Sequence, residues 1–79
     1  MSPRWSPCPR RLAIRRLKNL GFRGPLPGGN HEYMVRTGFR LTLPSNEEYS
    51  VDQLRRLLRQ VGKSLGRRMT LREWTDLGS

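Results

Sequence analysis

The fold is decided by residues 28–44, GGNHEYMVRTGFRLTLP, in which two short runs with apolar residues flank Thr37-Gly38. Such runs on both sides of a glycine-containing turn are typical of a β-hairpin. We expect its arms at 31–36 and 39–44, with His31 at the start of the first arm.

The register of this hairpin depends on the length of its loop. A three-residue loop with Gly38 left-handed places the apolar side chains of both arms on one face. This face contains Tyr33, Val35, Phe39, Leu41 and Leu43, with His31 at its end. A two-residue loop turns the second arm over and sets its apolar residues beside Met34. We predict the three-residue loop, because it gives one cleanly apolar face, with Arg40 and Thr42 facing away from the core.

Helices are expected on both sides of the hairpin, because apolar residues recur there at helical spacing. The first helix is expected from Pro9 and ends at Gly21, a glycine suited to a C-terminal cap. Ser50 and Gln53 form a capping box at the start of the second helix, which we expect to end at Gly62. The two apolar stripes are Ala13, Ile14, Leu17 and Leu20, and Val51, Leu54, Leu57, Leu58 and Val61.

The 79 residues are enough for one small domain, 1–79. We expect an irregular leader over 1–9 because it holds three prolines, a polar loop over 44–49, and a basic linker with a short helix over 63–79. Residues 22–27 are expected to be extended, and their two prolines allow an edge strand or a polyproline-like path. Thr70 and Glu73 form the capping box of that last helix. The fold class is therefore α+β, in the order α-β-β-β-α. A three-stranded antiparallel sheet carries two helices on one face, plus a short C-terminal helix.

The charge is strongly positive. Sixteen Lys and Arg stand against six Asp and Glu, a formal net charge of +10, and no acidic residue precedes Glu32. Fourteen of the cations are Arg, whose planar guanidinium can hold phosphate oxygens bidentately. This balance favours a nucleic-acid partner over a membrane.

Several classes of protein are excluded by what the chain lacks. It has no apolar run long enough to cross a bilayer or to form a signal-peptide core, so we expect a cytoplasmic protein. A single cysteine, Cys8, allows no internal disulfide. One cysteine and one histidine cannot build a zinc site, and we expect no metal and no small-molecule cofactor.

His31 is the only histidine and the natural candidate for acid–base chemistry near neutral pH. Taken in isolation, a lone histidine here is more often a hydrogen-bonded histidine at a strand end. For phosphate contacts we select the amides of Gly28, Gly29 and Asn30, since glycine lets the backbone approach closely, although two glycines also make ordinary turns. The basic candidates are Arg15, Arg23, Arg36 and Arg40. Arg15 lies on a helix face that is just as often only solvated.

In their order and spacing, four motifs resemble the HicA family of small bacterial mRNA interferase toxins. The resemblance runs over 10–62 and rests on Leu20-Gly21-Phe22 at the end of a helix, Gly29-Asn30-His31, Leu41-Thr42-Leu43-Pro44, and the leucine-rich residues 54–62. The chain departs from the family pattern in having Asn30 where Ser is usual, residues 24–27 in place of a basic strand, and a longer segment over 63–70.

The resemblance implies a fold similar to a double-stranded-RNA-binding domain and an mRNA-cleaving activity with His31 as the catalytic residue. It also implies a HicB-type antitoxin that covers the active site. Cleavage by the 2′-hydroxyl needs two proton transfers, and the second group is Tyr33, an arginine or water. A different interpretation of the same charge and element order is a non-catalytic double-stranded-RNA-binding module.

Overall fold

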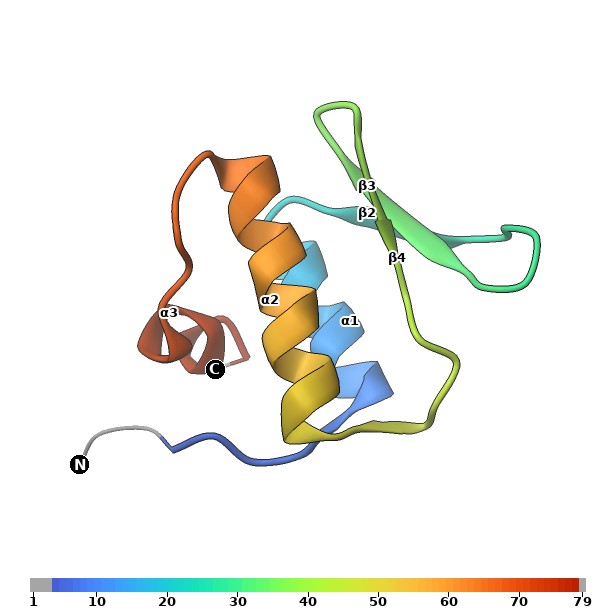
Figure 1. The fold of residues 1–79 in the computed structure, drawn as a ribbon. Helices are drawn as coiled ribbons and strands as arrows, with labels where there is room; N and C mark the ends of the chain where they lie inside the picture. Colours follow the sequence, from blue (N-terminus) through green and yellow to red (C-terminus); the bar gives the residue numbers. More distant parts are fainter. Residues whose placement is uncertain (1–3, 79) are drawn as a thin grey trace.

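The computed structural model describes residues 4–78 of the protein (Figure 1). Its elements in chain order are β1 (Cys8–Pro9), α1 (Arg10–Asn19), β2 (Arg23–Leu26), β3 (Tyr33–Arg36), β4 (Phe39–Thr42), β5 (Glu48–Tyr49), α2 (Val51–Leu65) and α3 (Leu71–Asp76). The strands β2, β3 and β4 form an antiparallel sheet in that order, with β2 at one edge. The α+β class and the three-stranded sheet are confirmed.

The turn of the hairpin has two residues, so the predicted three-residue register is wrong. Thr37 and Gly38 both have positive φ, 45° and 81°, and Arg36 pairs directly with Phe39. Two positive φ values fit the right-handed twist of the paired strands, which explains why the shorter turn is preferred. Met34 pairs with Leu41, and both are fully buried.

The outer face of the sheet therefore carries Tyr33, Val35, Arg40 and Thr42, of which Arg40 and Thr42 are exposed as expected. Tyr33 and Val35, expected in the core, are only half-buried there. The inner face packs toward the two long helices: α1 contacts β2, and α2 contacts β4. In Figure 1 these helices run side by side, next to the sheet.

The ends of α1 and the start of α2 follow the sequence signals. Gly21, at φ 107°, ends α1, and the Phe22 amide donates to the Leu17 carbonyl over 2.9 Å. The capping box of Ser50 and Gln53 is complete. Ala13 and Leu17 of the α1 stripe are buried, as are Leu54, Leu57, Leu58 and Val61 of the α2 stripe.

The end of α2 was predicted wrongly, because the helix passes Gly62 and ends at Leu65, capped by left-handed Gly66. The chain after the cap folds back over Gly62, where a Cβ would lie 2.8 Å from the Arg67 carbonyl oxygen. Glycine at this position therefore allows a close approach and does not stop the helix. The basic linker begins only after Leu65.

A second sheet, in which β1 pairs with β5, is not indicated by the sequence pattern. Cys8 pairs with Tyr49 and Pro9 with Glu48, and both Cys8 and Tyr49 are buried. The prediction of an irregular leader is thus wrong for residues 8–9, and the prediction of a polar loop is wrong for residues 48–49. Residues 1–3 of the predicted leader lie outside the described residues. Two-residue strands are too short to show the alternation by which strands are recognised.

The short helix α3 closes the core from the side of α2 opposite the sheet (Figure 1). The Thr70–Glu73 capping box is complete, and Trp74 is fully buried, so its side chain anchors α3 in the core. The Arg16 guanidinium lies 5.5 Å from the centroid of the Trp74 ring. In residues 4–78 no helix is long and apolar enough to cross a membrane.

Candidate functional site

His31 lies in the loop between β2 and β3, just before the strand in which it was expected, because β3 begins only at Tyr33. Its side chain is exposed, and its Nδ1 atom lies 2.8 Å from the Ser45 hydroxyl oxygen. Within residues 4–78 no group hydrogen-bonds the other ring nitrogen, Nε2. Ser45 therefore orients the ring and leaves Nε2 available for proton transfer.

Ser45 is itself positioned by the segment that follows β4. The buried Tyr49 hydroxyl donates to the carbonyl oxygen of Pro44 over 2.8 Å, and Arg10 Nε donates to the same oxygen over 3.3 Å. Burial raises the pKa of the Tyr49 phenol, so it stays protonated and remains a donor. These bonds fix the backbone directly before Ser45.

The His31 loop is tied to the same segment through Glu32. The Leu43 amide donates to the Glu32 carbonyl over 2.8 Å, and the Glu32 carboxylate pairs with Arg10. Arg10 thus contacts both sides of the His31–Ser45 pair. The positive charge of Arg10 also compensates the negative charge of Glu32, the residue that follows His31.

Gly28 and Gly29 differ sharply in their surroundings. A Cβ at Gly28 would lie 2.2 Å from the His31 carbonyl oxygen and 3.3 Å from atoms of both Tyr33 and Arg40. A Cβ at Gly29 would meet nothing within 4 Å. Gly28 therefore allows the loop to close on itself beside His31, whereas Gly29 is free of such a constraint.

Arg40, on the outer face of the sheet, lies next to this loop. The Arg40 guanidinium stacks on the Tyr33 ring, 3.7 Å from its centroid, and is close to Gly28. A stacked guanidinium keeps its donors in the plane of the group, where they can meet phosphate oxygens. Gly28, Gly29, the exposed Asn30 and His31 thus form one loop, and Arg40 lies next to this loop at Gly28.

Three other predicted phosphate contacts lie elsewhere. Arg36 is half-buried on the helix side of the sheet and donates to the carbonyls of Leu20 and Ser64 over 3.3 and 3.2 Å. Arg23 is exposed at the end of β2 away from the His31 loop, and Arg15 is exposed on α1. Arg36 therefore links the sheet to both helices, and the other two lie outside the group around His31.

Ser45 and Arg10 were missed as site residues, because nothing in the sequence joins positions 10, 31 and 45. The one available signal is that Ser45 follows the second hairpin arm while His31 precedes the first, so an antiparallel hairpin brings their segments together. Residues 4–78 contain no group of three His, Cys, Asp or Glu side chains that could hold a metal ion.

Comparison with known proteins finds no family model, no curated protein and no solved structure that matches this chain. Its function is therefore inferred from the arrangement of His31, Ser45, Gly28 and Arg40.

Proposed function

We propose that the protein is a metal-independent endoribonuclease whose catalytic residue is His31. The observation that carries the proposal is an exposed imidazole, held through Nδ1 by Ser45, on a loop whose Gly28 is close to the stacked guanidinium of Arg40. The chain around this site carries a net charge of +10, which attracts RNA.

The RNA itself supplies the nucleophile for its cleavage. The 2′-hydroxyl attacks the adjacent phosphorus, a tethered reaction that needs proton transfers and charge stabilisation. His31 Nε2 accepts the 2′-hydroxyl proton, a contribution of about 10²–10⁴-fold in rate. In this proposal water protonates the leaving 5′-oxygen, and the hydroxide that remains takes the proton back from His31. Tyr33 serves as the platform for Arg40.

Arg40 and the loop amides supply the electrostatic part. Donors aimed at the charge that develops on the phosphorane stabilise the transition state more than the ground state. The amides of the exposed residues Gly29 and Asn30 and the guanidinium of Arg40 are the groups near His31 that can do this. The products are a 2′,3′-cyclic phosphate and a 5′-hydroxyl end.

We also propose that the protein is a HicA-type mRNA interferase with a HicB-type antitoxin as partner. The motif order in the sequence supports this proposal, as does the succession α1, β2, β3, β4, α2, in which only the two-residue β5 intervenes before α2. With it we propose that the fold is similar to a double-stranded-RNA-binding domain. A restraining partner is expected, because an uncontrolled mRNA-cleaving enzyme harms its host. The test is co-expression with the product of an adjacent small acidic reading frame, which should co-purify and block cleavage.

The activity is tested with purified protein, single-stranded mRNA and EDTA. Wild type should cleave, and His31→Ala should not, although it keeps the fold by circular dichroism. Arg11→Ala, an exposed change on α1, is the matched control and should retain cleavage. Tight, salt-sensitive binding of duplex RNA without any cleavage would instead support the non-catalytic RNA-binding module.

A further inference from the structure

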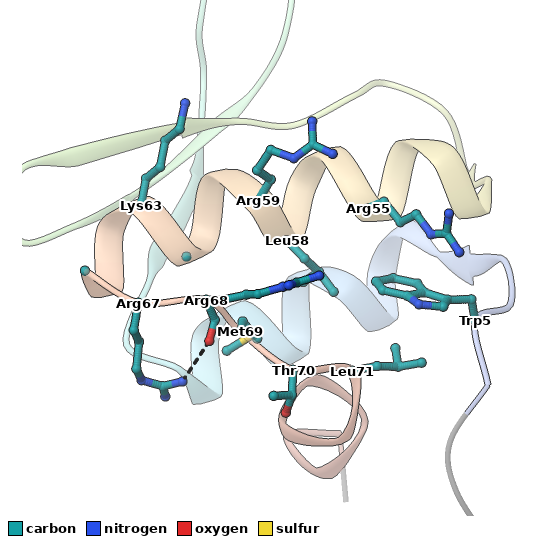
Figure 2. A pocket seen from close by; sticks show the side chains of 12 residues that line it. Trp5, Arg55, Leu58, Arg59, Lys63, Arg67, Arg68, Met69, Thr70 and Leu71 are labelled. Carbon is teal, nitrogen blue, oxygen red and sulfur yellow. Dashed lines mark hydrogen bonds between the residues drawn. The ribbon is translucent and has the colours of Figure 1, made fainter.

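A basic groove lies between α2 and the chain that leads into α3, on the side of α2 away from the sheet (Figures 1 and 2). Its volume is about 970 Å³. It is lined by Trp5, Arg55, Leu58, Arg59, Gly62, Lys63, Gly66, Arg67, Arg68, Met69, Thr70 and Leu71. None of these residues belongs to the group around His31, so the groove is a separate feature of the molecule.

The groove is defined by cations. Five of its twelve lining residues are Lys or Arg, and none is acidic. Glu73, just outside, pairs with Arg67 and neutralises that one charge. In Figure 2, Arg68 extends along the groove, while Arg59 and Lys63 project from α2 at its rim. Four cations therefore remain to attract a polyanion.

The remaining lining residues offer a place for bases. Trp5 is half-exposed at one end, and the Arg55 guanidinium lies 5.1 Å from the centroid of its ring. Leu58, Met69 and Leu71 contribute apolar surface along the groove. Aromatic rings combined with a basic track are the usual means by which proteins bind single strands without sequence preference.

We propose that this groove binds a single-stranded segment of RNA, with phosphates on Arg59 and Arg68 and a base stacked on Trp5. The proposal relies on the proposed endoribonuclease function only for the choice of RNA as the polyanion. It gives that enzyme a second contact with its substrate, on the far side of α2 from His31. An acidic peptide would match the charges but would not use the Trp5 ring.

The experiment measures binding of a labelled 2′-O-methyl-RNA of roughly twelve nucleotides, a length within the range that single-strand sites cover. The 2′-O-methyl groups prevent cleavage, so affinity is read independently of catalysis. Trp5→Ala should weaken binding about 5- to 150-fold, the effect of one lost stacking contact, and Trp5→Phe should restore most of it. Quenching of tryptophan fluorescence in the wild-type chain checks the same contact without any substitution.

The charges are tested through salt dependence. Arg59→Gln with Arg68→Gln should lower the log–log salt slope by about 1.4, at about 0.7 for each phosphate contact to a single strand. Arg11→Gln with Arg56→Gln is the matched control, because both side chains are exposed outside the groove. This control pair should change the slope by less than half as much.

Four results would overturn the proposal. They are unchanged binding by Trp5→Ala, equal effects of the two double variants, duplex RNA competing as well as the single strand, and polyglutamate competing as well as RNA. The last result would identify an acidic protein as the occupant. Failure of His31 to support cleavage leaves all these binding results intact, so the two proposals can fail separately.

Discussion

His31 and Ser45 meet across the end of the hairpin, with 2.8 Å between the imidazole Nδ1 and the hydroxyl oxygen. Ser45 has no charge and is exposed, so its effect on His31 is one of orientation. Ser45→Ala should lower the RNA cleavage rate roughly tenfold, the effect of losing about one hydrogen bond. Ser45→Thr keeps the hydroxyl and should keep the rate. Equal rates for Ser45→Ala and wild type in single-turnover cleavage would show that the contact has no role.

The two loop glycines provide a matched pair. Gly28→Ala places a Cβ against the His31 carbonyl and must displace the loop, whereas Gly29→Ala meets nothing. A displacement of about 1 Å at a catalytic group can cost roughly 10²-fold in rate, so cleavage by Gly28→Ala should fall by about that factor. Gly29→Ala keeps the backbone amide that is proposed to contact phosphate, so it should cleave normally. Similar rates for the two variants would contradict the assignment of Gly28 as the residue that shapes this loop.

Arg36 and Arg40 occupy opposite faces of the sheet and should respond differently to substitution. Arg36→Met loses two hydrogen bonds to backbone carbonyls and should destabilise the fold by about 2 kcal/mol in urea unfolding. Arg40→Met should change stability by less than about 0.5 kcal/mol. For single-stranded RNA it should lower the log–log salt slope of binding by about 0.7. The reverse pattern would mean that Arg36 is the RNA contact.

Glu73 should make the docking of α3 sensitive to acid. A hydrogen bond from Arg67, together with the Thr70 amide, lowers the pKa of Glu73 from its ordinary 4.5 to about 2. A lowered pKa stabilises the folded state above the unfolded value, and this contribution is lost as pH falls from about 4.5 toward 2. In a Trp5→Phe background, Trp74 fluorescence should report the loss.

The control for this titration is Glu73→Gln, which keeps an acceptor for the Thr70 amide but carries no charge. Its resistance to urea should be lower than that of the parent chain at pH 7 and should converge with it near pH 2. A constant difference between the two proteins across this range would show that the Arg67–Glu73 pair contributes nothing to α3.

The elements with strong local signals were predicted well. The capping boxes at Ser50 and Thr70, the cap at Gly21 and the apolar stripes of α1 and α2 depend on residues close in sequence, and the structure confirms them. The hairpin existed as predicted, but its register did not follow from the pattern. Both registers bury apolar residues, and the choice depends on positive φ at Thr37 as well as Gly38.

The features that failed depend on long-range contacts. Gly62 has the pattern of a helix stop, but its actual role depends on the Arg67 backbone, which packs against it. Cys8 has the pattern of an irregular leader, but it pairs with the distant Tyr49. The contacts of Ser45 and Arg10 with residues 31–32 are also long-range, so the sequence did not predict these two residues for the site. Long-range hydrogen bonds likewise hold Arg36 on the helix side of the sheet. His31 adjoins the glycines because that relationship is local in the sequence, but it lies before β3 and not in the strand in which it is expected.

The central claim is that His31 cleaves RNA without a metal ion. Its most direct test is analysis of the ends produced from single-stranded RNA in EDTA. Wild type should yield 2′,3′-cyclic phosphate and 5′-hydroxyl ends, and folded His31→Ala should yield none. Undiminished cleavage by His31→Ala, or no cleavage by the wild type, would contradict the claim.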